Sequence, residues 1–203
     1  MRQVHYMLDI ETFGTGPNAA VVSLGCCRFD PELGVVPTII NDDRDATHPA
    51  EHTLHVKFDL KDELFPGDID ASTVLWWLQQ SKEAQESITE GYRVTAPIGL
   101  DYINNWVEED RVTPRERVLW SNGPTFDETI MRSMYNRNDK VFPFHYRSSS
   151  CFRTIKRLAM MRGWEQVSAF EDFGLVEHNA LHDALFQAHQ VCEMYSALRQ
   201  ESD

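Results

Sequence analysis

The sequence predicts an α/β fold in one domain that spans residues 1–203. Hydrophobic residues make up 42% of the chain and charged residues 25%, without a low-complexity tract, which is typical of a folded α/β protein. Strand-like alternation of apolar and polar residues dominates the N-terminal part, and helical spacing dominates most of the rest. The chain is long enough to bury one sizeable hydrophobic core.

Three strands are expected before the first helix. Apolar and polar residues alternate from Val4 to Glu11, so that Asp9 and Glu11 share one face of the first strand. The nearly continuous apolar run over 20–29 predicts a buried second strand, and alternation returns over 52–60. Strands that follow one another in this way typically form a meander.

Helical spacing begins at Ser72, a residue type that often caps a helix, and returns over 97–107 behind a proline. A short strand over 118–120 is then expected to end in a turn. Beyond it, Thr125 and Glu128 match the capping-box pattern, which places Asp127 in the first turn of the next helix. Such strand-to-helix junctions are where open α/β sheets hold ligands.

Two more helices are expected in the C-terminal part. One runs over 150–161, and the last begins after Asn179, its expected N-cap, and continues to about Tyr195. His178 therefore lies just before the last helix, and Asp183 lies in its first turns. Two side chains five residues apart inside one helix diverge by about 140°. An unwound His178, in contrast, can face Asp183.

Composition also bounds the location of the protein. No apolar run approaches the roughly 20 residues that span a bilayer, and the first residues do not resemble a secretory signal. We therefore expect a cytoplasmic protein without a membrane partner. The four cysteines include no Cys-x-x-Cys pair, and buried free thiols are expected. The sequence leaves a homodimer open.

The net charge of -13 argues against a protein that coats nucleic acid with its whole surface, because phosphates attract positive charge. Residues 132–162 are the exception, with eight basic residues and one acidic residue. The segment is either a solvated face or, beside a catalytic site, a contact for phosphates. We select three of its arginines as candidates for backbone phosphates: Arg147, Arg153 and Arg157.

Four carboxylates fall at three points of the predicted fold. Asp9 and Glu11 lie on the first strand, Asp127 lies at the junction, and Asp183 lies on the last helix. Each point alone is weak evidence, because acidic residues are common on strand edges and in first helical turns. Together they supply the several oxygen ligands that hard divalent cations such as Mg²⁺ or Mn²⁺ require.

Three motifs resemble the exonuclease motifs of the DEDDh group within the DnaQ-like superfamily, in the same order and approximate spacing. They are Asp9-Ile-Glu11-Thr12, Asn122-Gly-x-x-Phe126-Asp127 and His178-x4-Asp183. Two further segments, Trp76-Trp77-Leu-Gln-Gln80 and Trp120-Ser-Asn-Gly123, resemble DexA-type phage and prophage exonucleases and RNase AS-type exoribonucleases. The resemblance covers most of the chain and implies a ribonuclease H-like fold, with a mixed central β-sheet flanked by α-helices.

The resemblance also implies a metal-dependent 3′-to-5′ exonuclease that hydrolyses single-stranded nucleic acid to nucleoside 5′-monophosphates with two divalent cations. By analogy, Asp9 would bridge both cations, Asp127 and Asp183 would complete one, and Glu11 would bind near the other or the attacking water. His178 would take a proton from that water. The DexA-like segments favour DNA slightly over RNA.

Several alternatives stay open. Thr12 and Phe13 are candidate substrate-binding residues. Phe13 would stack a base, but it fits a core residue at a strand end equally well. His182, about 100° around the helix from Asp183, is expected at the surface. His178 and His182 have the spacing of two zinc ligands, although an oxygen-rich site suits Mg²⁺ better than zinc. Other functions are a ribonuclease H-like endonuclease and a non-catalytic nucleic-acid-binding module.

Overall fold

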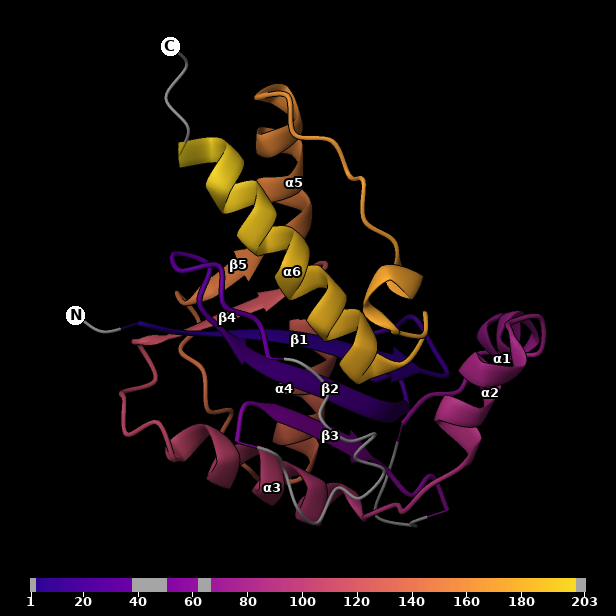
Figure 1. Ribbon diagram of the computed structural model, residues 1–203. Helices are drawn as coiled ribbons and strands as arrows, with labels where there is room; N and C mark the ends of the chain where they lie inside the picture. The colour runs from indigo at the N-terminus through magenta and orange to yellow at the C-terminus, as the bar shows by residue number, and fades with distance from the viewer. Residues whose placement is uncertain (1–2, 38–50, 62–66, 200–203) are drawn as a thin grey trace.

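A five-stranded mixed sheet forms the centre of the computed structural model, which describes residues 3–37, 51–61 and 67–199 (Figure 1). Its strand order is β3-β2-β1-β4-β5. The expected antiparallel meander consists of β1 (Val4–Thr12), β2 (Val21–Phe29) and β3 (Thr53–Lys57). On the other side of β1, β4 (Arg117–Ser121) and β5 (Ser149–Cys151) pair in parallel.

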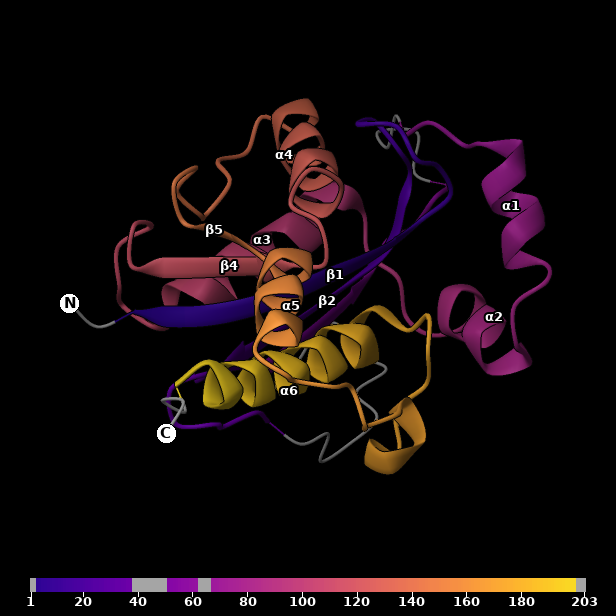
Figure 2. The same ribbon diagram turned by 90° about the horizontal axis from the view of Figure 1, so that it is seen from above.

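Helices cover both faces of this sheet, as predicted. One face packs against α3 (Ala96–Glu108) and α4 (Asp127–Arg137), and the other against α5 (Phe152–Met161) and α6 (Ala180–Arg199). The pair α1 (Ala71–Trp77) and α2 (Lys82–Thr89) stands beyond one end of the sheet (Figure 2). A short 3₁₀ helix, η1 (Phe170–Phe173), precedes α6.

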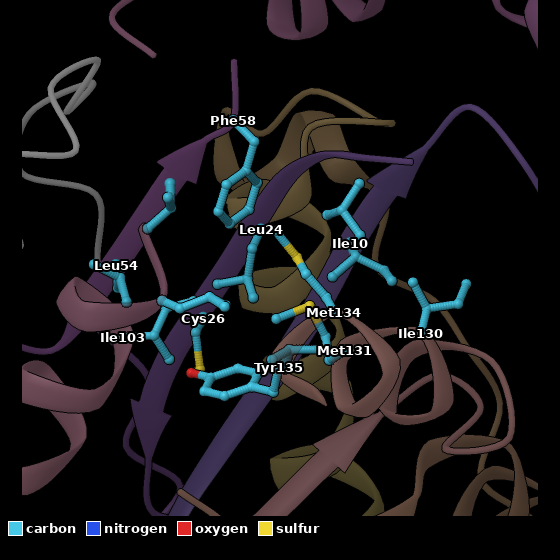
Figure 3. Close-up of a cluster of buried hydrophobic side chains, with 14 of the residues drawn as sticks. Ile10, Leu24, Cys26, Leu54, Phe58, Ile103, Ile130, Met131, Met134 and Tyr135 are labelled. Atoms are coloured by element: carbon cyan, nitrogen blue, oxygen red, sulfur yellow. The ribbon is translucent and has the colours of Figure 1, made fainter. Parts of the chain in front are cut away.

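The alternation along β1 sorts its side chains between two cores. Tyr6, Leu8 and Ile10 join the cluster under α3 and α4, where Ile10 lies among the labelled side chains of Figure 3. Met7 belongs to the cluster under α5 and α6. Asp9 is in phase with Met7 and therefore points to the α6 face, as the alternation predicts.

A glycine lets α6 approach the sheet closely. Gly25 on β2 pairs with Asp9 on β1. A Cβ added to Gly25 would lie 2.1 Å from the main-chain carbon of Ala180 and from the main-chain nitrogen of Leu181. The first turn of α6 thus rests directly on the backbone of β2, beside the strand that carries Asp9.

Two helix starts differ from the expected ones. Asp70, and not Ser72, caps α1, and its carboxylate accepts the Ser72 N–H at 3.1 Å. The aspartate two residues earlier therefore takes the role that we gave to the serine. The expected helix over 150–161 begins at Phe152, because residues 149–151 pair with β4.

The capping box at Thr125 is also wrong. Phe126 is the N-cap of α4, and its side chain makes no capping hydrogen bond. Glu128 does not reach back to the cap, because it forms a salt bridge with Arg132 and accepts a hydrogen bond from the Ser149 hydroxyl. Asp127 nevertheless lies in the first turn of α4, as expected.

All four cysteines are free thiols, as expected, although only Cys26 and Cys27 are fully buried. Among the described residues, no helix has both the length and the apolar character that crossing a membrane requires.

The contact at Gly25 generates a first prediction. Gly25→Ala should destabilise the fold by about 3 kcal/mol, the upper part of the range for overpacking, because main-chain atoms block the new methyl group. Gly16→Ala is the matched control, since no heavy atom lies within 4 Å of a Cβ added there. Chemical denaturation of both variants measures the difference. Equal midpoints for Gly25→Ala and the wild type would contradict the close packing.

Candidate active site

Three carboxylates meet between β1 and α6. Asp9, Glu11 and Asp183 each offer one oxygen, and these oxygens all lie within 4.8 Å of one another. The alternation of β1 directs Asp9 and Glu11 to the same face, and the close contact at Gly25 brings the first turn of α6 over them. The geometry thus unites residues that are more than 170 positions apart in the chain.

Asp127, the fourth predicted carboxylate, lies at the edge of this group. It is buried at the start of α4, and its Oδ2 accepts the Gly123 N–H at 3.2 Å. It is not among the three closest oxygens, but its negative charge contributes to raising the pKa of Asp9 and of Glu11. All four carboxylates therefore belong to one electrostatic unit, which we call the carboxylate cluster.

Burial and mutual repulsion disfavour the charged forms of these groups. Burial, followed by the charge of Asp183, raises the pKa of Asp9 and of Glu11 well above their ordinary values. Burial raises the pKa of Asp127 to about 6 and that of Asp183 to about 7. Carboxylates held this close are stable in the ionised form only when positive charge lies among them.

The cluster fits a divalent cation. Oδ2 of Asp183 is buried and has no hydrogen-bond partner among the described residues. An unpartnered buried acceptor is costly unless an ion or water satisfies it. The group of three closest donors contains oxygen only, which suits a hard cation better than zinc, because zinc prefers nitrogen and sulfur ligands.

Gln187 supports the cluster and was not predicted from the sequence. Its Nε2 donates to Oδ1 of Asp9 at 2.9 Å, and its side chain is buried. This hydrogen bond opposes the other effects on Asp9 by lowering its pKa. Gln187 lies one turn after Asp183 on the same face of α6, and this helical spacing is the one signal in the sequence that points to it.

His178 has an unusual backbone conformation. Its φ is 62°, in the left-handed region, which costs a residue with a side chain roughly 1 kcal/mol. Its imidazole contacts the ring of Trp76 edge to face, with 4.9 Å between the centroids. Its backbone N–H, like that of Asn179, lowers the pKa of Asp183. The segment before α6 therefore contacts the cluster through its main chain.

Asn179 caps α6, as predicted. Its Oδ1 accepts the N–H groups of Leu181 at 3.1 Å and of His182 at 3.3 Å.

His182 is not the surface residue that we expected. It is half-buried, and its Nδ1 accepts the N–H of Val176 at 2.8 Å, because the chain before the helix folds back over it.

A pocket of about 430 Å³ opens beside Glu11, between β1 and α1. Thr12 lines it, donates from Oγ1 to the Gly14 carbonyl at 2.7 Å, and accepts the indole N–H of Trp77 at its main-chain carbonyl at 2.9 Å.

Phe13 does not line this pocket and instead packs against the buried cluster of Val22, Trp77, Ala84 and Ile88. The more exposed aromatic side chain of the pocket is Trp76, which is 41% exposed.

The three candidate arginines are separated by the fold. Arg153 lies at the site, because its Nε donates to Oδ1 of Asn122 at 3.2 Å and its charge lowers the pKa of Asp127. Arg157 follows one turn later on the exposed side of α5. Arg147 stacks on Tyr146 before β5 begins. Because β5 runs parallel to β4, this position lies toward the opposite end of the strands from Asp127.

Comparison with known proteins gives consistent matches. A family model described as the 3′-5′ exoribonuclease Rv2179c-like domain matches residues 4–195. The exodeoxyribonuclease of Enterobacteria phage T4 is 27% identical over 211 residues, which cover 96% of this chain and 88% of that protein.

Solved structures of several nucleases have the same fold. Cell-death related nuclease 4 aligns with a TM-score of 0.63 at 14% identity, over 96% of this chain and 64% of that chain. The zinc-bound complex of E. coli ExoI with single-stranded DNA aligns with a TM-score of 0.62 at 14% identity, over 98% and 41% of the two chains. The chain thus spans less than two thirds of both.

The nuclease domain of 3′hExo, a DEDDh family member bound to rAMP, aligns with a TM-score of 0.56 at 11% identity, over 96% of this chain and 92% of that one. At these identities the likeness concerns the fold. It confirms the predicted ribonuclease H-like architecture.

The repulsion within the cluster generates a second prediction. In EDTA, Asp183→Asn should raise the melting temperature by about 2–4 °C, because it removes one charge from the cluster at a gain of about 1 kcal/mol. Mg²⁺ or Mn²⁺ should stabilise the wild type and have a much smaller effect on the variant. The control is Glu171→Gln at an exposed position. A lower melting temperature of Asp183→Asn in EDTA would contradict the repulsion.

Proposed function

Because the chain belongs to the family of Rv2179c-like 3′-5′ exoribonuclease domains, we propose that it removes nucleotides stepwise from the 3′ end of single-stranded DNA. Membership of this family makes the protein a hydrolase with 3′-5′ exonuclease activity on nucleic acid. The observation that carries the finer proposal is the close group of Asp9, Glu11 and Asp183, of which Glu11 is buried and the other two are half-buried, beside an aromatic pocket. Its products would be nucleoside 5′-monophosphates.

The choice of DNA rests on the phage relative, whose printed name is exodeoxyribonuclease, and on E. coli ExoI, which was solved with single-stranded DNA. RNA is the second candidate, because the family description names an exoribonuclease. Discrimination between the two depends on contacts to the 2′-hydroxyl. The hydroxyl groups of Ser72 and Thr73, which line the pocket, are candidates for such contacts.

Asp9, Glu11, Asp127 and Asp183 would hold two divalent cations, Mg²⁺ or Mn²⁺. When bound, the cations would make water a better nucleophile and stabilise the charge that develops on the attacking and leaving oxygens. Asp9 is among the three closest carboxylates, and the charges of Asp183, Glu11 and Asp127 all raise its pKa. Gln187 would keep the Asp9 carboxylate in a fixed orientation.

His178 would act as the general base and take a proton from the attacking water. Imidazole is suited to accept and release protons near neutral pH. The contact with Trp76 restricts the motion of the ring, and the backbone of His178 adjoins Asp183. The proposed general base, His178, and Asp183 of the carboxylate cluster therefore lie on one short segment of the chain.

The pocket beside Glu11 would hold the base and sugar of the terminal nucleotide. Among the described residues, Glu11 is the one charged residue that lines the pocket, so the pocket suits a neutral nucleoside better than a phosphate. Trp76 offers an exposed aromatic face there, and stacking on such a face is worth about 1–3 kcal/mol without sequence preference. Arg153 would contact a backbone phosphate.

A paired degradation assay tests this function. DNA and RNA oligonucleotides of one sequence, labelled at the 5′ end, are incubated without metal, with Mg²⁺ and with Mn²⁺. We expect a descending ladder that requires a cation and forms faster with DNA. Cleavage of a circular single strand would instead indicate an endonuclease. Tight binding without products would indicate a non-catalytic module, and a ladder that persists in EDTA would exclude the metal site.

The left-handed backbone of His178 provides a clean test of the general base. Asparagine tolerates this conformation, so His178→Asn should fold with a melting temperature close to that of the wild type. The variant should lose activity by about 10²–10⁴-fold, the usual contribution of a general base. Calorimetry and single-turnover kinetics measure the two effects. Full turnover by His178→Asn would show that the imidazole is not the base.

A further inference from the structure

The segment that carries His178 is held on two sides. On one side, Asn179 caps α6, and a main-chain hydrogen bond runs from the Asp183 N–H to the Asn179 carbonyl at 2.8 Å. The carbonyl of His178 lies one residue outside this ladder. On the other side stands α2, whose Ser87 hydroxyl donates to the His178 carbonyl at 2.9 Å.

Ser87 is placed to act on this carbonyl. Its side chain is buried, and its hydroxyl lies 2.7 Å from the Ala84 carbonyl as well. A hydroxyl has one proton, so Ser87 shares that proton between its own helix and the His178 segment. The hydrogen bond spans 91 positions in the sequence and ties the segment before α6 to the α1–α2 pair.

The same pair of helices also holds the ring of His178. Trp76 contacts the imidazole edge to face, and Trp77 lies at 6.2 Å between centroids. Trp77 is in turn anchored to β1, because its indole N–H donates to the Thr12 carbonyl at 2.9 Å. The α1–α2 pair therefore contacts both the main chain and the side chain of His178, and the pair is itself attached to β1.

We propose that Ser87 is a positioning residue that keeps His178 in the left-handed conformation required of the general base. This inference rests on the proposed role of His178. A φ of 62° is uncommon for a residue other than glycine and persists where the surrounding structure holds it in place. Without the Ser87 hydroxyl the peptide that follows His178 can rotate, and this rotation changes the direction in which the imidazole leaves the chain.

The consequence is specific to the chemical step. Ser87 is not part of the carboxylate cluster, and it does not line the pocket beside Glu11. Loss of its hydroxyl should therefore lower kcat and leave KM unchanged. Misplacement of a reacting group by about 1 Å can cost up to about 100-fold in rate, and we expect a loss of about 10-fold here.

The test compares Ser87→Ala with Thr89→Ala in the full chain. Thr89 lies on the same helix, is exposed, and donates its hydroxyl to the Gln85 carbonyl at 2.7 Å. Both changes remove a hydroxyl from α2, but only Ser87 contacts His178. We expect a reduced kcat for Ser87→Ala alone at saturating Mn²⁺, with KM within about 2-fold of the wild type for both variants. An unchanged kcat for Ser87→Ala would overturn the proposal.

A double-mutant cycle with His178→Asn separates positioning from a general loss of structure. If Ser87 acts through the imidazole, Ser87→Ala should cause no further loss of activity in the His178→Asn background. A further loss of about 10-fold there would overturn the proposal. Wild-type turnover by His178→Asn alone would instead refute the general base of the proposed function. The two failures are therefore distinguishable.

Discussion

The close approach of α6 to the sheet at Gly25 is the contact on which the site depends. No side chain separates the first turn of the helix from β2 at this point, opposite Asp9 in the register with β1. One helix face can then supply both Asp183 to the carboxylate cluster and Gln187 to the Asp9 oxygen. A helix held farther away would leave the carboxylates of β1 without either partner. Core packing and site geometry are thus parts of one constraint.

This constraint concentrates negative charge, and the fold offsets part of that cost locally. Main-chain N–H groups at the starts of α4 and α6 lower the pKa of Asp127 and of Asp183, and Arg153 adds a positive charge near Asp127. These effects are smaller than the burial that raises the same pKa values. The negative charge that is not offset favours the binding of cations, as is usual where carboxylates are crowded together in a protein.

The parts of this architecture that follow short-range periodicity could be predicted from the sequence. Alternation along β1 placed Asp9 and Glu11 on one face, and the cap at Asn179 placed Asp183 in the first turn of α6. Competition between neighbours could not be predicted in the same way. Asp70 caps α1 in place of Ser72, and Glu128 forms a salt bridge with Arg132 instead of completing the capping box. Contacts across long sequence distances, such as that between Gln187 and Asp9, leave no local pattern beyond helical spacing.

The contrast between Phe13 and Trp76 shows why sequence adjacency is a poor guide to a binding surface. Phe13 follows Glu11 closely but turns into the cluster that attaches the α1–α2 pair to β2. That packing is what presents Trp76, from a distant part of the chain, to the pocket and to His178. The aromatic side chain nearest in sequence thus supports the one that contacts the site. The sheet, α4 and α6 fix the carboxylates, whereas the α1–α2 pair fixes the imidazole, so separately packed parts of the fold meet where hydrolysis would occur.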